Sequence, residues 1–411
     1  GNTYISEAIK KGASIVVSDK IKKKINNKKV IKVNNSLEFM TKISGNVRNI
    51  FHGKIIGITG SCGKTSLKEL LSNSLNKVGK ASSSPRSYNN KYGVPLSLFN
   101  LNVKNNYGIF EIGMDKKGEI DFLSKLVNPD IGIITNISYA HAKNFKNILE
   151  IAKAKSEIIN NIKKDGFIIL NSDDKFFTFH KKIAIKRKIN IVSFGYSHKS
   201  NIRFLNIKKF GNSFKIKVKI FNQIQIFDIK YKYVNYIKNI LSTLAVLSVL
   251  DKIDNLKSNL FRGFTIPDGR GNISKIKFKN KKIFLIDESY NSNPLSLSSA
   301  ISNFSNSDVQ NKRKHFLMGD MLELGKHSKR LHKNMSSVIN DSKISKIHIF
   351  GKDVSETYKG IQKNRRGRIL RDKSDIFNLI VKDLNNNDYL MIKGSNSTGL
   401  NRIVGTLRGS I

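Results

Sequence analysis

Disulfides and membrane spans are the first features that the sequence excludes. It contains a single cysteine, Cys62, so no disulfide can form within the chain, which is typical of a protein of the reducing cytoplasm. No run of residues approaches the roughly 18 apolar positions that a membrane-spanning helix needs. The most apolar stretch, residues 237–250, contains Lys238 and Asn239 and predicts a buried helix. We therefore expect a cytoplasmic protein without a transmembrane segment.

Acidic residues are scarce as well. The chain has 30 Asp and Glu against 74 Lys and Arg, a formal charge of +44. A nucleic-acid-binding protein usually gathers its basic residues in one stripe or along one helix, whereas lysine is spread here along the whole sequence. We interpret the charge as a bias of composition, expect no nucleic acid partner, and interpret the basic run KNRRGR at 363–368 as a solvated loop. The charge still favours anionic substrates such as nucleotides.

The pattern of apolar residues predicts two α/β units after a short first segment. The 411 residues have room for about two or three domains. Between residues 54 and 267, apolar runs alternate with helical patterns, which is typical of a parallel sheet covered by helices. We predict strands at 107–112, 131–135 and 167–171, helices at 119–126 and 148–162, and an antiparallel hairpin pair at 208–232 that extends the sheet. A second unit starts near residue 269, with strands at 283–286, 315–318, 346–350 and 389–392. The first segment predicts a helix at 5–11, a strand at 14–17 and a helix at 37–47.

Residues 54–66, KIIGITGSCGKTS, are the most informative stretch. An apolar strand runs into a glycine-containing turn, and a helical pattern follows at once. This order is typical of a phosphate-binding loop, in which backbone N–H groups and a helix dipole face an anion, a lysine adds charge and a hydroxyl binds Mg²⁺. The loop is a variant, because Ile58 stands where the common pattern has its first glycine. The residues predicted to bind are Gly60, Ser61, Cys62, Gly63, Lys64, Thr65 and Ser66.

Three further residues lie where such a loop would use them. Glu111 ends a predicted strand, and ligands of open α/β sheets gather beyond the carboxyl ends of strands, so this carboxylate is placed to hold Mg²⁺. His141 follows another strand end, and Lys155 lies 14 residues later on a helix that returns to the same face. Each alone is more typical of an ordinary surface or structural residue; together with the loop they predict a site.

Three polar loops follow strands of the second unit. Their sequences are DESYNSNP at 287–294, GDMLELG at 319–325 and KGSNSTG at 393–399. Turn chemistry explains any one of them, but three at one edge of a sheet predict a site for a ligand with several hydrogen-bonding groups.

Taken together, these segments resemble the Mur ligases of peptidoglycan synthesis. The similarity runs from residue 1 to the end and is carried by GITGSCGKTS, SYNNKYGVPLSL, EIGMDKKGEI, ITNISYAHAKNF, AKAKSEI, DESYNSNP, GDMLELGKHS and KGSNS. DESYNSNP and GDMLELG are most similar to the family member that adds D-alanyl-D-alanine to UDP-N-acetylmuramoyl-tripeptide. The DNPR-type motif that binds diaminopimelate is absent. Two alternatives stay open: another Mur-type ligase that adds a diamino acid, and a basic nucleic-acid-binding P-loop ATPase.

The resemblance implies three domains and a monomer. Residues 1–53 correspond to the remainder of a UDP-sugar-binding domain, 54–268 to a central ATP-binding P-loop domain, and 269–411 to a Rossmann-like domain for the incoming dipeptide. We expect the first half of the UDP-sugar domain to be missing, because the pattern begins at Gly1 in the middle of a small domain. In the implied reaction a peptide carboxylate attacks ATP to give an acyl phosphate, and an amine then displaces phosphate to form an amide.

The resemblance also implies a role for each catalytic residue. Lys64 would bind the β and γ phosphates, and Thr65 with Glu111 would hold a first Mg²⁺. His141 would hold a second Mg²⁺ near the acyl phosphate. Lys155 corresponds to a lysine that the family uses as a carbamate, an anion able to approach that metal.

The remaining implied contacts concern the substrates. Asn89 and Asn90 would line the site between ATP and the muramoyl peptide, Asn239 would reach the nucleotide base, and Arg270 would contact phosphate. The mouth of the last domain would be lined by Asp287, Tyr290, Asn291 and Asn293. The chain departs from the family pattern at Asn235, where a histidine is usual, and at Asn396, where an arginine is usual.

Overall fold

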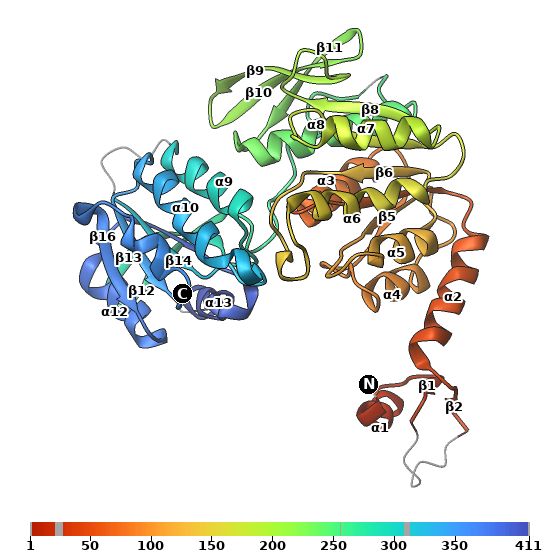
Figure 1. Cartoon of the computed structure of the whole chain (residues 1–411), viewed down its shortest axis with the longest axis horizontal. Coiled ribbons are helices and arrows are strands. Elements are labelled where there is room, and N and C mark those ends of the chain that lie inside the picture. The colour runs from red at the N-terminus through yellow and green to blue at the C-terminus, as the bar shows by residue number, and fades with distance from the viewer. Residues whose placement is uncertain (1, 21–27, 255, 308–312, 410–411) are drawn as a thin grey trace.

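The part of the chain that the structure describes forms three separate sheets with helices packed around them. The computed structural model describes residues 2–20, 28–254, 256–307 and 313–409. Its sheets have two, nine and six strands. In Figure 1 the nine-stranded sheet lies between the six-stranded unit, drawn in blue, and a small N-terminal part, drawn in red. Within the described residues, no helix is long and apolar enough to cross a membrane.

The N-terminal part is small and stands apart from the rest. It contains η1 (Asn2–Tyr4), α1 (Ile5–Lys10), β1 (Val16–Ser18), β2 (Val30–Lys32) and α2 (Ser36–Ile50), with β1 and β2 parallel. Figure 1 shows α2 running from this part to the central unit. There Ser44 Oγ donates to the Pro95 carbonyl at 2.7 Å, and Arg48 Nε donates to the Val127 carbonyl at 2.7 Å. Helix α2 therefore fastens the small part to the central unit.

The central unit is built on the nine-stranded sheet, in the order β11-β10-β9-β8-β7-β6-β3-β5-β4. Ile55, Ile56 and Ile58 of β3, an interior strand of the parallel part of this sheet, have no exposed surface, because helices cover both faces of a parallel sheet. The predicted strands at 107–112, 131–135 and 167–171 are confirmed to within about a residue. The elements are β3 (Lys54–Thr59), α3 (Lys64–Leu75), β4 (Ala81–Ser83), α4 (Gly93–Phe99), β5 (Tyr107–Glu111), α5 (Glu119–Val127), β6 (Ile131–Ile134), η2 (Ala142–Asn144), α6 (Ile148–Asn160), β7 (Phe167–Asn171), α7 (Phe177–Lys186), β8 (Asn190–Gly195), β9 (Ile202–Phe210), β10 (Ser213–Ile220), β11 (Gln223–Ile229) and α8 (Val234–Val249).

The antiparallel stretch extends this sheet, as predicted, but differs in extent. It has three strands and starts at Ile202 rather than at residue 208. β9 pairs with β8 in parallel, and β10 pairs with β9 and β11 in antiparallel fashion. Helix α8 packs beneath it and is almost wholly buried, which confirms the buried helix predicted at 237–250.

The C-terminal unit has a six-stranded sheet in the order β12-β13-β17-β14-β15-β16. Only the edge strand β12 is antiparallel to its neighbour. Because β13, β17 and β14 are adjacent, the three predicted polar loops that follow them lie at one edge of the sheet. The elements are β12 (Asn272–Phe278), β13 (Lys281–Glu288), α9 (Pro294–Ser305), β14 (Lys314–Gly319), η3 (Gly325–His327), α10 (Ser328–Asn340), β15 (Lys346–Phe350), α11 (Ser355–Lys359), η4 (Lys363–Arg365), β16 (Arg366–Leu370), α12 (Lys373–Asp383), β17 (Tyr389–Lys393), η5 (Asn396–Thr398) and α13 (Leu400–Arg408).

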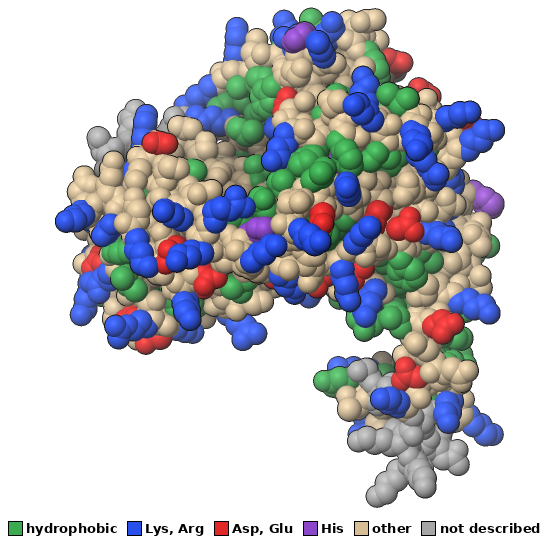
Figure 2. Space-filling model, in the orientation of Figure 1, with side chains coloured by type: hydrophobic (Ala, Val, Ile, Leu, Met, Phe, Trp, Pro, Cys, Tyr) green, Lys and Arg blue, Asp and Glu red, His purple; other side chains and the backbone are tan. Residues whose placement is uncertain are grey.

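The basic run at 363–368 is not a solvated loop, and that interpretation is wrong. It forms η4 and the start of the edge strand β16. The Arg365 guanidinium donates to the carbonyls of Asn340, Ser342 and Ile344. An arginine carries five N–H donors, so it can satisfy carbonyls at the end of a helix as well as face water. Elsewhere lysine and arginine side chains are scattered over the face seen in Figure 2 and do not gather in one patch. A bias of composition predicts this distribution.

Two buried histidines connect strands of the C-terminal sheet. His315 Nδ1 lies 3.1 Å from His348 Nε2, and the Arg368 backbone N–H donates to His348 Nδ1 at 2.9 Å. Because His348 Nδ1 accepts a hydrogen bond, the proton of this ring is on Nε2, which donates to His315 Nδ1. The proton of His315 is therefore on Nε2, which lies 3.6 Å from Asp388 Oδ2. Burial lowers the pKa of His315 to about 4 and that of His348 to about 3. Both rings are therefore neutral at neutral pH.

We expect acid to destabilise the C-terminal unit through this pair. Unfolded histidines, with a pKa of about 6.5, bind protons that the folded pair does not, so stability is complete above that pH. It falls as the pH is lowered from about 6.5 towards 4, by up to about 1.4 kcal/mol per pH unit for each ring. His348→Gln cannot titrate and should remove about half of the loss. Urea unfolding followed by circular dichroism at pH 7 and pH 5 measures the loss of unfolding free energy. His198→Gln, at an exposed position, is the control. An equal loss in wild type and His348→Gln would contradict the assignment.

Candidate active site

The turn between β3 and α3 has the backbone of an anion-binding loop. Gly60 has a φ of +145°, and a Cβ at this position would lie 1.9 Å from Thr135 Oγ1. Gly63 has a φ of +83° and is the N-cap of α3. No other residue type fits Gly60, because a side chain would collide with the strand next to it. The first backbone N–H groups of α3 have no acceptor within the helix and, with its dipole, favour an anion here.

The outer side of this loop is held by the residues that follow β6. The Ser61 backbone N–H donates to the Asn136 carbonyl at 2.9 Å, and the Cys62 N–H donates to Asn136 Oδ1 at 3.0 Å. Thr135 Oγ1 donates back to the Cys62 carbonyl at 2.8 Å. The sequence did not mark Thr135 and Asn136 as functional, although both lie in the segment ITNIS. Asn136 accepts hydrogen bonds from two backbone N–H groups of the loop. The N–H groups available to an anion are therefore those at the N-terminus of α3.

Four of the residues named from the sequence, Lys64, Thr65, Asn89 and Glu111, lie close together beside the N-terminus of α3. Lys64 Nζ donates to the Gly60 carbonyl at 3.0 Å, and burial lowers the pKa of Lys64 while the nearby Glu111 raises it. Thr65 Oγ1 donates to Glu111 Oε2 at 2.6 Å, and Asn89 Nδ2 donates to Glu111 Oε1 at 2.7 Å. The Glu111 carboxylate is buried and oriented by two neutral donors.

The Thr65 and Glu111 pair fits the predicted Mg²⁺ in its chemistry. Hydroxyl and carboxylate oxygens are donors that this cation prefers, and Mg²⁺ is usually bound by one or two protein groups together with phosphate oxygens and water. Among the described residues, no group of three or more His, Cys, Asp and Glu side chains is placed to hold a metal. The protein therefore offers a partial site that a phosphate would complete.

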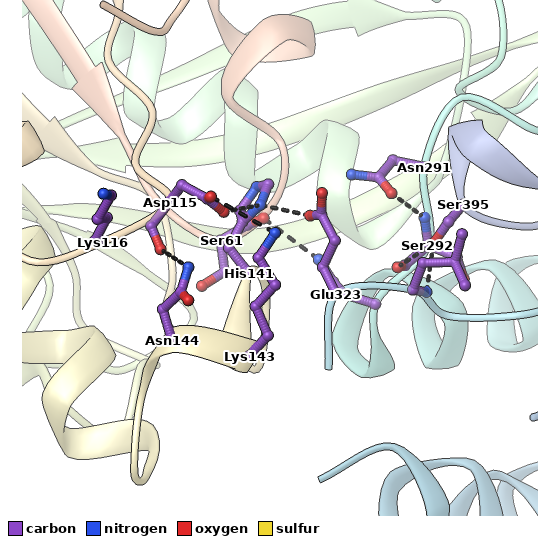
Figure 3. A network of polar contacts seen from close by, with 12 residues as sticks. Ser61, Asp115, Lys116, His141, Lys143, Asn144, Asn291, Ser292, Glu323 and Ser395 are labelled. Atoms are coloured by element: carbon purple, nitrogen blue, oxygen red, sulfur yellow. Dashed lines mark hydrogen bonds and ion pairs between the residues drawn. The ribbon is translucent and has the colours of Figure 1, made fainter. Parts of the chain in front are cut away.

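His141 lies in a strained loop and contacts the other unit. Its φ of +54° lies in the left-handed region, which is uncommon for residues other than glycine. Its Nδ1 atom lies 2.6 Å from Glu323 Oε2 and 3.8 Å from Asp115 Oδ1, as Figure 3 shows. The adjacent His141 ring holds the pKa of Glu323 below its usual value. His141 thus joins the central unit to a polar loop of the C-terminal unit.

Lys155 is buried on α6 behind the loop. Its side chain is 1% exposed, and burial lowers its pKa well below the usual value, with Lys64 lowering it further. Within the described part of the chain, no hydrogen-bond or ion-pair partner reaches its amine. These conditions favour the neutral amine, which is the nucleophilic form.

A cavity of about 380 Å³ lies between the two units. It brings together most of the predicted site residues: Ser61, Cys62, Gly63, Lys64, Thr65, Ser66, Asn89, Glu111, His141, Asn239, Arg270, Tyr290, Asn291 and Asn293. Four predicted residues do not line it: Gly60, Asn90, Lys155 and Asp287. The positions that depart from the family pattern, Asn235 and Asn396, do line it.

Two of the residues outside the cavity support its walls. Asn90 Oδ1 accepts the backbone N–H groups of Tyr92 and Gly93 and so begins α4. Asp287 Oδ2 accepts the Gly269 N–H at 3.2 Å, where Gly269 has a φ of +73°, and also lies 3.2 Å from the Arg408 guanidinium. Asp287 therefore stabilises the segment that connects the two units, and it does not line the cavity.

Contacts between the units are made by the polar loop at 287–294. The Tyr290 hydroxyl bonds to Ser87 Oγ, and the Arg270 guanidinium lies 4.2 Å from the centre of the Tyr290 ring. Asn293 caps α9 through the Ser296 N–H, and its Nδ2 atom donates to the Ser61 carbonyl at 3.3 Å. The mouth of the second unit is thus placed directly against the phosphate-binding loop.

Three charged residues of the cavity were not predicted. Lys393 Nζ lies 3.2 Å from Glu288 Oε2 and donates to the Asn291 carbonyl at 3.0 Å. Glu323, in the loop at 319–325, lies against His141. All three residues are in the polar loops recognised from the sequence, but their individual contacts depend on strand order in the folded sheet.

The comparisons agree with this geometry. The family model for the Mur ligase middle domain matches residues 58–247, and that for the Mur ligase, glutamate ligase domain matches residues 274–396. The UDP-N-acetylmuramoyl-tripeptide--D-alanyl-D-alanine ligase of Rickettsia prowazekii is 31% identical over 408 residues, which cover 98% of this chain and 89% of the relative.

Two solved structures show the same fold. MurF from Acinetobacter baumannii aligns with a TM-score of 0.84 at 23% identity, covering 99% of this chain and 88% of that one. MurF ligase from Thermotoga maritima in complex with ADP aligns with a TM-score of 0.82 at 22% identity, covering 99% and 91%. Since one relative exceeds 30% identity over nearly the whole chain, and both α/β units match family models, the chain belongs to the Mur ligase family.

Proposed function

We propose that the chain is an ATP-dependent ligase that joins D-alanyl-D-alanine to UDP-N-acetylmuramoyl-tripeptide in peptidoglycan synthesis. One observation carries the proposal: the phosphate-binding loop and three polar strand-end loops surround a single cavity. A nucleotide and an amine-bearing acceptor can therefore meet there. The reaction forms a C–N bond and converts ATP to ADP and phosphate.

The first step makes an acyl phosphate. A carboxylate oxygen of the tripeptide attacks the γ-phosphorus of ATP, an O–P bond forms, and the bond to ADP breaks. The N-terminus of α3 and the Lys64 ammonium stabilise the negative charge that moves onto the β-phosphate. Arg270, held over the Tyr290 ring, adds a second cation at the phosphates, and Asn239 lies on α8 beside Gly63 to contact the nucleotide.

Mg²⁺ fits the same end of the cavity. Thr65 and Glu111 would hold one ion and His141 a second, and the ions would neutralise charge on the phosphate oxygens. Lys155 is proposed to act as a carbamate: its neutral amine attacks CO₂, an N–C bond forms, and the nitrogen loses a proton to solvent. The product is an anion, which can approach a metal ion that a neutral amine on α6 would attract less.

The second step forms the amide. The amine of the dipeptide attacks the acyl carbon, phosphate leaves, and a proton passes from the nitrogen to solvent or a nearby base. Tyr290, Asn291 and Asn293 are proposed to line the acceptor end, and Asn89 the space between the nucleotide and the muramoyl peptide. We propose that the domains correspond to residues 1–53, 54–268 and 269–411, and that the enzyme is a cytoplasmic monomer.

The two alternatives have less support. A ligase that adds a diamino acid would share the phosphate loop, but the motifs DESYNSNP and GDMLELG resemble the dipeptide-adding member. A nucleic-acid-binding ATPase would account for the positive net charge of the chain. It would not account for the polar loops at 287–294 and 393–399. Phosphate release stimulated by diaminopimelate or lysine would favour the first alternative. Release stimulated by DNA or RNA would favour the second.

Phosphate release from ATP and Mg²⁺ should require both substrates. We expect release only when UDP-N-acetylmuramoyl-tripeptide and D-alanyl-D-alanine are present together, because the acyl phosphate must form before the amine can displace phosphate. Lys64→Ala should lower kcat by about 100-fold or more, since it removes a preorganised cation at the phosphates. Lys80→Ala, at an exposed position of the same unit, is the control and should match wild type. Release that is indifferent to either substrate would reject the proposed function.

Carbamylation of Lys155 should be visible without turnover. Protein equilibrated with ¹³C-bicarbonate should show a carbamate signal in its ¹³C NMR spectrum, because burial favours the neutral amine that reacts with CO₂. The signal should be absent from Lys155→Ala and present in Lys153→Ala, an exposed lysine of the same helix. A signal that persists in Lys155→Ala would assign the carbamate to another lysine.

A further inference from the structure

The antiparallel end of the central sheet has one buried face and one outer face. Along β10, Ile216, Val218 and Ile220 are buried in the core that includes α8, so the lysines that alternate with them point to the other side of the sheet. Figure 1 shows β9, β10 and β11 at the end of the sheet away from the N-terminal part. None of the residues on this outer face lines the cavity between the two units.

Strand pairing brings basic residues together on the outer face. Lys215 lies opposite Lys208, and Lys219 lies opposite Arg203. Lys217 lies between Lys215 and Lys219 on the same face. Within the described part of the chain, none of these five residues forms an ion pair. Like charges directly opposite each other destabilise a sheet, so an anion lying over the face would stabilise it.

Protection of a sheet edge does not explain these lysines. Natural sheets often have lysine on an edge strand, where it prevents pairing with other chains, but the edge strand here is β11, and β10 lies inside the sheet. On β11, Ile224 and Ile226 are instead 56% and 50% exposed. Their partners on β10 are Lys219 and Lys217. The outer face therefore combines exposed apolar side chains with a row of cations.

An exposed aromatic ring lies on the other side of the same face. Phe210, at the end of β9, is 63% exposed and is two residues from Lys208, so both point the same way. The Lys215 ammonium lies 4.3 Å from the centre of the Phe210 ring. Bulky apolar side chains flanked by lysine are typical of protein surfaces that bind at the boundary between lipid headgroups and acyl chains.

We propose that the outer face of β9, β10 and β11 binds the surface of a membrane that contains anionic lipids. The basic residues contact lipid phosphates, and Phe210, Ile224 and Ile226 enter the headgroup layer. A nucleic acid would also attract the lysines, but its charged backbone offers the isoleucines no apolar contact. Attachment of this kind needs no membrane-spanning helix, and it does not require the proposed ligase activity.

Sedimentation with lipid vesicles tests the basic residues. The full chain should bind vesicles made of equal parts phosphatidylglycerol and phosphatidylcholine and should not bind pure phosphatidylcholine, and added salt should weaken the binding by screening. One basic residue near an anionic bilayer contributes about fivefold in affinity, so removal of three should weaken binding by about 100-fold. The variant combines Lys215→Gln, Lys217→Gln and Lys219→Gln. The matched control removes the same charge from exposed positions of α7 and should bind nearly as well as wild type; it combines Lys181→Gln, Lys182→Gln and Lys186→Gln.

A second variant tests the apolar side chains. Ile224→Ser combined with Ile226→Ser keeps every charge and should weaken vesicle binding by about tenfold, because less apolar surface enters the bilayer. All variants should keep the circular dichroism spectrum of wild type, since the changed residues do not belong to the core. These measurements need no turnover, so they decide the role of the face even if the proposed function fails.

Four results would overturn the proposal. Wild type could fail to bind the anionic vesicles, or the two lysine variants could lose binding equally, which would mean that net charge alone matters. The isoleucine variant could bind as tightly as wild type, which would leave the apolar side chains without a role. Tighter binding to a short DNA duplex than to vesicles, lost in the β10 lysine variant, would assign the face to nucleic acid instead.

Discussion

Burial of cationic side chains beside the phosphate-binding loop is the constraint on which the site depends. Lys64 and Lys155 lie close enough for Lys64 to lower the pKa of Lys155, and Arg270 lowers that of Lys64. Burial is the larger cause of the lowered pKa of both lysines, because it disfavours the charged form. Glu288 neutralises Lys393 nearby. A phosphate group at the N-terminus of α3 would favour the charged form of Lys64.

The backbone of the loop between β3 and α3 brings these cationic side chains close together. The turn at Gly60 passes so close to Thr135 that no side chain fits, and this close approach brings the start of α3 beside the residues that follow β6. Thr135 and Asn136 then occupy the outer polar groups of the loop. The N–H groups that remain for a ligand are those at the N-terminus of α3, where the dipole also favours an anion.

Sheet topology provides the second half of the site. In the C-terminal unit β17 lies between β13 and β14, so loops that are far apart in sequence emerge side by side. Asn293 and Glu323 come from two of these loops and reach the central unit at two places, the phosphate loop and the His141 loop. The part of the cavity beside the polar loops and the part beside the phosphate-binding loop therefore belong to one contact surface between the two units. Removing the second unit would expose both ends to water.

Sequence alone determined the features that depend on neighbouring residues. The order of strand, glycine turn and helix identified Lys64 and Thr65, and the alternation of apolar runs identified the strand that ends in Glu111. Only the tertiary structure decided the rest. Asn90 and Asp287 support the walls of the cavity, and Arg365 donates to carbonyls that follow a helix. Glu323 contacts His141 across 182 positions of chain. The physical reason is that a hydrogen bond is made with whichever group the sheet order brings within about 3 Å, and strand order is set by the packing of the whole unit and not by any local pattern.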